Sequence, residues 1–292
     1  MSPLAHVLRN LVWTNPLVYG CGEAVIDYLP QLGWLMCRSL RSSHHGSGGQ
    51  QDHSDAVLAF SAKGGHNNEP HNHNDLGHFI LHGGGENLLC DLGAGLYTKA
   101  YFSPGRESII NISSSGHSVP IINGTAQQSG AKARAVVLDV AMDEQEGAQT
   151  VTSFKLDLTS AYAVDEMAVF TRSFAWSVLE GNEGARLTVT DHFEFETSGM
   201  NVKPWDVEEL LISRIQPNTG AGFVEWKGTN AVARLNYDAG ALRQRLEAVK
   251  HIDHDGVPFV FYKTSLQLDS NRWNGSASVD CNLFFTIHQS SC

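Results

Sequence analysis

KGGHNNEPHNHND, residues 63–75, is the most informative segment of this 292-residue chain. It packs three histidines, four asparagines and two carboxylates into thirteen residues, shortly after the apolar run at residues 56–60. This density of imidazole and amide groups is typical of a site that binds a metal ion, a sugar or both. In an extended segment, side chains at i and i+2 lie on the same face, so His71 and His73 can face one point. The segment therefore predicts a binding loop that follows a strand.

Two later residues extend this loop to a candidate metal site. Asp91 follows the apolar residues 88–90, where a strand would present a carboxylate at its end, and His117 lies just before another apolar stretch. Zinc takes imidazole nitrogen and carboxylate oxygen at about 2.0–2.2 Å and is usually four-coordinate. One of His71 and His73, together with Asp91 and His117, would leave the fourth position to water. Spacing alone leaves open the alternative of unrelated surface histidines.

Strand patterns dominate the chain after residue 55. Segments rich in β-branched and aromatic residues alternate between inward and outward positions, as in stacked antiparallel sheets. Residues 181–184 are typical of a hairpin turn, and helical periodicity recurs only at residues 206–211. The strands are predicted at residues 131–139, 149–158, 168–179, 185–197, 222–226, 231–237, 259–268 and 277–287.

These patterns predict a mainly β fold with two unequal parts. A large antiparallel β-sandwich is expected at residues 46–292, and a short helical segment at residues 1–45. In the latter, Leu4, Val7 and Leu8 recur at helical spacing. A chain of this length can form one large domain or two unequal ones.

The composition excludes several classes of protein. The formal net charge is −11, from 31 acidic against 20 basic residues, which disfavours nucleic acid as a partner and counts mildly against a highly sulfated polymer. No apolar run approaches the length of a membrane span, and the N-terminus lacks the pattern of a secretory signal. Five cysteines without a framework favour reduced thiols, with Cys90 and Cys281 in the core, and this suggests a cytoplasmic protein without fixing its location.

Five short motifs resemble the C-terminal β-sandwich domain of the heparinase II/III-like polysaccharide lyases. They occur in the order of the family with similar gaps, so the combined match is specific over residues 63–124. The motifs are Lys63-Gly-Gly-His-Asn67, Pro70-His-Asn-His-Asn-Asp-Leu-Gly77, Asp91-Leu-Gly-Ala-Gly-Leu-Tyr97, Phe102-Ser-Pro-Gly-Arg106 and Ser113-Ser-Ser-Gly-His-Ser-Val-Pro-Ile-Ile-Asn-Gly124.

The resemblance implies a division of labour between the paired histidines. In the family, a structural zinc ion is held by the second histidine of the pair, the aspartate and the later histidine. The corresponding residues here are His73, Asp91 and His117. The first histidine, His71, faces the substrate. Zn²⁺ is therefore the expected cofactor.

The resemblance also implies β-elimination on a uronic-acid-containing polysaccharide or oligosaccharide. This reaction needs a neutralised carboxylate, a base for the adjacent proton and an acid for the leaving oxygen, and histidine and tyrosine suit these proton transfers. The candidate residues are His71, Tyr97 and Tyr101 for catalysis and His66, Asn67 and Arg106 for substrate binding. Relatives commonly have tyrosine after the arginine, whereas this chain has Glu107.

Members of the family normally have a large α/α toroid before the sandwich, with the catalytic cleft between the two. The short segment at residues 1–45 resembles only the end of that toroid. We therefore expect a fragment, a truncated product or one half of a split enzyme. The expected partners are an acidic polysaccharide or oligosaccharide and a toroid domain or chain, or further copies of this chain.

Two alternatives from other classes remain. One is a non-catalytic carbohydrate-binding or structural β-sandwich. The other is a cupin-like metal protein, because a β-rich fold with a His-x-His pair is also typical of cupins. A cupin would have a glutamate soon after the pair, where Gly77 and His78 stand, and the next glutamate, Glu86, lies too far along the chain.

Overall fold

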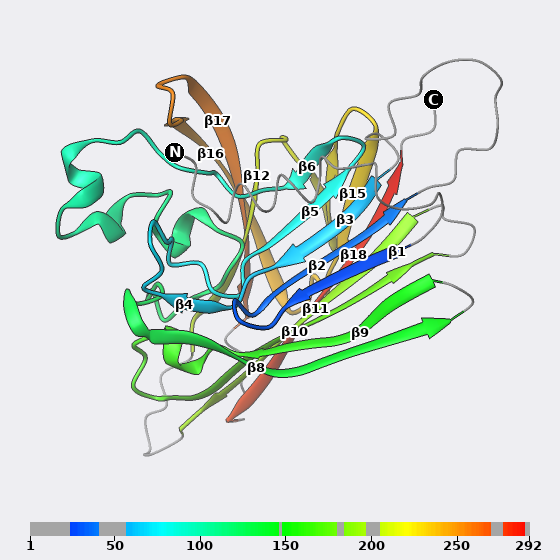
Figure 1. Cartoon of the computed structure of the whole chain (residues 1–292), viewed down its shortest axis with the longest axis horizontal. Coiled ribbons are helices and arrows are strands. Elements are labelled where there is room, and N and C mark those ends of the chain that lie inside the picture. Colours follow the sequence, from blue (N-terminus) through cyan, green and yellow to red (C-terminus); the bar gives the residue numbers. More distant parts are fainter. Residues whose placement is uncertain are drawn as a thin grey trace.

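The structure is a computed structural model that describes residues 24–40, 57–145, 148–179, 184–196, 205–269 and 277–289. Within these ranges the chain forms three antiparallel sheets, and its helical residues belong to short 3-10 turns (Figure 1). The predicted antiparallel β-sandwich is confirmed. No helix among the described residues is long and apolar enough to span a membrane.

Two of the sheets face each other and form the sandwich. The five-stranded sheet has the order β1 (Ala24–Leu29), β2 (Trp34–Leu40), β3 (Val57–Ala62), β5 (Phe79–Gly83) and β6 (Glu86–Leu89). The nine-stranded sheet has the order β13 (Asn218–Gly220), β14 (Phe223–Lys227), β15 (Ala231–Asn236), β18 (Ser278–Gln289), β11 (Gly184–Phe195), β10 (Met167–Val178), β9 (Ala148–Asp157), β8 (Gly130–Gln145) and β4 (Gly65–Asn67).

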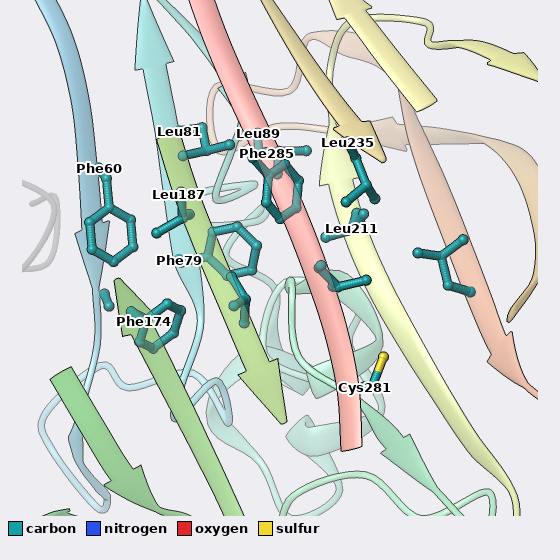
Figure 2. Packing of buried hydrophobic residues seen from close by; sticks show 14 of the residues in the cluster. Phe60, Phe79, Leu81, Leu89, Phe174, Leu187, Leu211, Leu235, Cys281 and Phe285 are labelled. Carbon is teal, nitrogen blue, oxygen red and sulfur yellow. The ribbon is translucent and has the colours of Figure 1, made fainter. Parts of the chain in front are cut away.

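Aromatic side chains from both sheets fill the space between them. The ring of Phe60 on β3 lies 5.4 Å from that of Phe174 and 5.8 Å from that of Trp176, both on β10. Phe79 on β5 meets Phe285 on β18 at 5.7 Å, and Figure 2 shows these rings pointing into one layer. Each such fully buried side chain contributes about 1.5–3 kcal/mol through the hydrophobic effect, so this layer is what holds the two sheets together.

A third sheet joins the end of the sandwich that carries the histidine-rich loop. Its strands are β16 (Leu242–Ile252), β17 (Pro258–Leu268), β12 (Val207–Ser213) and β7 (Ile121–Ile122). The backbone N–H of Cys90, just after β6, donates to the carbonyl of Ile212 on β12 at 2.9 Å. This contact anchors the third sheet beside the chain segment that leads into Asp91.

The strand predictions hold for all eight segments, which correspond to β8, β9, β10, β11, β14, β15, β17 and β18. Two helical predictions are wrong. Residues 206–211 form most of β12, because pairing with β7 and β17 overrides the helix-like spacing of Val207, Leu210 and Leu211. Residues 24–40, expected in the helical segment, are β1 and β2, which form a hairpin on β3. Residues 1–23 and most of the predicted turn at residues 181–184 lie outside the described ranges.

Among the described residues, four short 3-10 turns lie in the connections between strands: η2 (Lys99–Phe102), η3 (Arg106–Ser108), η4 (Ser114–Gly116) and η5 (Thr159–Ala161). The first three belong to one long connection between β6 and β7. Figure 1 shows this connection gathered at the same end of the sheets as β4. The fold thus brings the five motifs of the sequence to one end of the sandwich.

A surface cluster on the outer face of the nine-stranded sheet is centred on His192. His192 on β11 lies opposite Asp280 on β18, and its two ring nitrogens lie 2.6 Å from Asp280 Oδ1 and 2.9 Å from Glu194 Oε1. Only the imidazolium form can donate from both nitrogens. The hydrogen bond to Glu194 and then that to Asp280 raise the pKa of His192, although partial burial opposes them.

We expect His192→Gln to lower the melting temperature at about pH 5.5 and to have little effect at about pH 8.5. Because the folded-state pKa lies above the unfolded value, the stabilisation is present at low pH and is lost as the pH rises through the folded pKa. Thermal unfolding of the variant and the wild type at both pH values measures this. Glu194→Gln should follow the same trend, and an equal deficit at both pH values would contradict the assignment.

Candidate functional site

Four side chains from three separate segments converge next to the sandwich. His73 and Asp75 come from the loop between β4 and β5, Asp91 from the residues just after β6, and His117 from the end of η4. One ligand atom of each lies within 4.8 Å of the ligand atoms of the other three. The structure therefore brings together the three predicted metal ligands, His73, Asp91 and His117. It adds Asp75, which was not predicted as a ligand. The sequence signal that could have indicated it is its position two residues after His73.

The imidazole of His117 has one free lone pair that faces the two carboxylates. Its Nε2 lies 2.9 Å from the backbone carbonyl of Asn111, so this nitrogen carries the proton and donates. Its Nδ1 is buried, has no hydrogen-bond partner among the described residues, and lies 3.5 Å from Asp91 Oδ2 and 3.8 Å from Asp75 Oδ2. A lone pair that faces carboxylate oxygens is repelled unless a cation or a proton lies between them. This geometry fits a divalent metal ion.

His73 is held in the neutral form that binds metals. Its ring centroid lies 5.2 Å from that of His117. Burial lowers its pKa to about 4, although the nearby Asp91 acts in the opposite direction. At neutral pH His73 therefore offers a lone pair and does not have to lose a proton before it coordinates a metal ion.

Each carboxylate binds a donor of the protein with one oxygen and turns the other oxygen toward the cluster. Asp91 Oδ1 accepts a hydrogen bond from the backbone N–H of Gly93 at 2.6 Å. Asp75 Oδ1 forms an ion pair with Lys63, and both side chains are buried. Burial alone would raise the pKa of Asp75, but Lys63 and the two histidines outweigh it and lower the pKa to about 2. Two nitrogen and two oxygen donors form a set that suits zinc.

His71 does not share a face with His73. The backbone N–H of Asn72 donates to the carbonyl of Glu69 at 3.1 Å, which closes a turn with Pro70 and His71 at its centre. His71 has a φ of 59°, the left-handed value that the third residue of such a turn requires. The expectation that both imidazoles face one point is therefore wrong. The turn leaves His71 exposed to solvent and directs His73 into the cluster.

The predicted substrate-binding residues differ in their accessibility. His66 is exposed, and its Nδ1 accepts a hydrogen bond from the N–H of Asn68 at 3.2 Å. Asn67 is buried and donates to Gln127 Oε1 at 3.3 Å and to the carbonyl of Gln128 at 2.8 Å. Of these two residues, His66 alone presents its side chain to solvent.

Arg106 connects two parts of the site. Its guanidinium donates to the carbonyl of Tyr101 at 3.2 Å and to that of Asn72 at 3.1 Å. These bonds fasten the η2 turn to the backbone between His71 and His73.

The two predicted tyrosines lie against each other, with ring centroids 4.8 Å apart. Tyr101 is buried, and its hydroxyl accepts a hydrogen bond from the N–H of Gly95 at 3.3 Å. Burial raises the pKa of Tyr101. Tyr97 is half-buried and also contacts the ring of His254 at 4.4 Å. Tyr97 is therefore the more accessible phenol of the two.

Asn111 is a buried connector that the sequence analysis did not identify. Its carbonyl accepts from His117, its Nδ2 donates to the carbonyl of Gly93 at 3.0 Å, and its Oδ1 lies 2.6 Å from Nε2 of His251. His251 lies on β16, a mostly polar strand that the apolar pattern did not predict. In the sequence Asn111 stands out only as a glycosylation sequon, and full burial excludes glycosylation of the folded protein.

Comparison with known proteins identifies the family. Residues 25–246 match the family described as Heparinase II/III-like, C-terminal. The chain belongs to this family. The predicted resemblance is thereby confirmed, and the match extends well beyond the motif region to most of the chain. Membership in the heparinase II/III-like family relates the chain to polysaccharide lyases.

Solved structures of lyases share the fold of this heparinase II/III-like chain. A heparinase III (BT4657 gene product) matches with a TM-score of 0.62 and 12% sequence identity, over 91% of this chain and 36% of its own. The heparan sulfate lyase HepC from Pedobacter heparinus matches with a TM-score of 0.63 and 11% identity, over 92% of this chain and 37% of its own. This chain thus spans little more than a third of these lyases. None of the curated proteins matches it.

Proposed function

We propose that the chain is the sandwich part of a polysaccharide lyase that acts by β-elimination on a uronic-acid-containing polysaccharide or oligosaccharide and carries a structural zinc ion. The observation that carries this proposal is the cluster of His73, Asp75, Asp91 and His117. Its residues belong to the motifs that resemble the lyase family, and its donors suit zinc. The match to the family gives independent support.

His73, Asp75, Asp91 and His117 would hold the zinc ion. When bound, zinc would supply a fixed positive charge that joins the three segments. Four protein donors complete a tetrahedral set, whereas catalytic zinc sites keep a position open for water or substrate. The closed set therefore favours a structural role, in which the residues around the cluster carry out the chemistry.

The exposed side of the histidine-rich loop would face the substrate. His71 stands at the tip of its turn, and its imidazole would neutralise the uronate carboxylate or accept the proton next to it. Tyr97 is our preferred donor of the proton to the leaving oxygen, because Tyr101 is buried and bonded to Gly95. His66 would hydrogen-bond the sugar. Asn67 and Arg106 would act by holding the loop, since Asn67 donates to the carbonyl of Gln128 and Arg106 to that of Asn72.

A non-catalytic carbohydrate-binding module is the second candidate. It is favoured by the low identity of the structural match, since 12% identity to the heparinase III chain shows a shared fold alone. In that case the same surface would bind an acidic sugar, and no bond would be cleaved.

We expect the purified chain alone to give little or no unsaturated uronate from any uronate polymer, because the part that would complete the cleft is not among its described residues. Adding a toroid domain of a family lyase should produce the unsaturated product, which ultraviolet absorbance measures. His71→Ala in the same mixture should abolish it. Sugar binding without product in either mixture would favour the non-catalytic module, and rapid turnover by the chain alone would contradict the prediction.

A further inference from the structure

A buried arginine lies beneath the two loops that carry the metal ligands. Arg172 on β10 stands directly opposite Asp191 on β11, in the nine-stranded sheet. Glu209 reaches the same guanidinium from β12, in the third sheet. All three side chains are nearly inaccessible to solvent, with exposed fractions of 1% for Arg172 and Asp191 and 2% for Glu209. The ion cluster therefore connects two sheets inside the protein.

Arg172 uses all five of its N–H donors. Three of them go to carboxylates: Nε to Asp191 Oδ1 at 2.7 Å, and Nη2 to Asp191 Oδ2 at 2.5 Å and to Glu209 Oε2 at 2.7 Å. The bidentate bond to Asp191 fixes the plane of the guanidinium. Burial raises the pKa of Glu209 well above its usual range, and the neighbouring Asp191 adds to this effect.

The remaining two N–H groups of Arg172 point out of the ion cluster, toward the two loops that carry the proposed metal ligands. Nη1 donates to the carbonyl of Gly77 at 3.1 Å and to the carbonyl of Ser118 at 3.0 Å. Gly77 lies two residues after Asp75, and Ser118 directly follows His117. One nitrogen atom thus binds both loops, at points adjacent to ligands from each of them.

The backbone of Gly77 lies close against this arginine. Gly77 has a φ of +80°, and a Cβ added there would lie 3.4 Å from Arg172 Cδ and 2.7 Å from Leu158 Cδ1. The added Cβ would overlap Leu158, whereas its distance from Arg172 is that of an ordinary van der Waals contact. The positive φ and the contact with Leu158 therefore account for the glycine, whose carbonyl lies within reach of Nη1.

We infer that Arg172 is a positioning residue for the metal site: oriented by Asp191 and Glu209, it fixes the spacing between the loop of His73 and Asp75 and the loop of His117. Groups behind metal ligands commonly set the affinity of a site by holding the ligands in place. This inference rests on the proposed metal site for its effect on zinc, whereas its effect on the two loops is independent of zinc.

The test compares Arg172→Lys with Leu235→Ala in the full chain. Lysine keeps the charge, but its single ammonium cannot make the fork to Asp191 and also bind both carbonyls. Leu235→Ala removes a buried side chain from β15, outside the ion cluster, and controls for lost stability. Zinc affinity is measured by competition with a chromophoric chelator, and backbone mobility by hydrogen exchange read by mass spectrometry.

We expect Arg172→Lys to weaken zinc binding about 10-fold or more and to speed exchange in the peptides around Gly77 and Ser118. Leu235→Ala should lower the melting temperature and leave both readouts as in the wild type. Asp191→Asn keeps Arg172 and should weaken zinc binding to a smaller extent than Arg172→Lys does. It replaces Arg172→Lys in the test if that variant does not fold.

The outcomes separate this inference from the proposed function. If the wild type binds no zinc, the proposed metal site fails, and faster exchange at the two loops in Arg172→Lys still supports the positioning role. Unchanged zinc affinity together with unchanged loop exchange in both Arg172→Lys and Asp191→Asn would overturn it.

Discussion

His73→Ala should remove the bound metal and lower the melting temperature by about 10 °C, whereas His71→Ala should leave both unchanged. The purified wild type should contain about one zinc per chain. A ligand that binds only the folded state at about a thousand times its Kd contributes about 4 kcal/mol, and a protein of this size loses about 2–4 °C per kcal/mol. Elemental analysis and thermal unfolding measure the two effects.

The matched control for this experiment lies two residues away in the same loop. His71 is exposed at the tip of a turn, whereas His73 is buried beside Asp91 and His117. A chelator should destabilise the wild type and the His71 variant equally, and it should have little effect on the His73 variant. If both substitutions destabilise the protein to the same extent, the two histidines share one role, and the assignment of His71 to the substrate loses its support.

Gly116→Ala should destabilise the protein by about 4 kcal/mol or more and should abolish zinc binding. A Cβ at Gly116 would overlap the backbone carbonyl oxygen of Ile110, and backbone cannot move aside as a flexible side chain can. Relief of the overlap moves either the backbone before His117 or that at Ile110, next to Asn111, whose carbonyl accepts from His117. Denaturant unfolding and chelator competition measure the two losses.

Gly124→Ala is the control for this prediction. Gly124 adopts a left-handed φ of +72°, and a Cβ there meets no atom within 4 Å, so alanine pays only a conformational cost of about 1–2 kcal/mol. It should retain zinc. If Gly116→Ala proves as mild as Gly124→Ala, the loop around His117 tolerates movement, and the tight geometry inferred for the metal site is wrong.

The sequence determined the sandwich and most of its strands. The segments that became β8 to β11 alternate apolar and polar residues at a period of two, and this local signal was enough to place them. It also determined three ligand candidates and the family, because the motifs are contiguous and occur in order. The weak points were segments whose local pattern conflicts with their tertiary contacts. Residues 206–211 have helical spacing but pair as β12, and β16 is too polar for its alternation to be recognised.

Only the tertiary structure decided how the site is assembled. The turn at Pro70 separates His71 from His73, although the two are close in sequence, and the ion pair with Lys63 turns Asp75 into the cluster. Arg172 lies far along the chain from the ligands, yet two of its hydrogen bonds hold their loops. Such contacts arise because β12 of the third sheet lies against β10 and β11 of the nine-stranded sheet. No local periodicity encodes them, because they depend on which distant strands pack together and on buried polar groups finding partners.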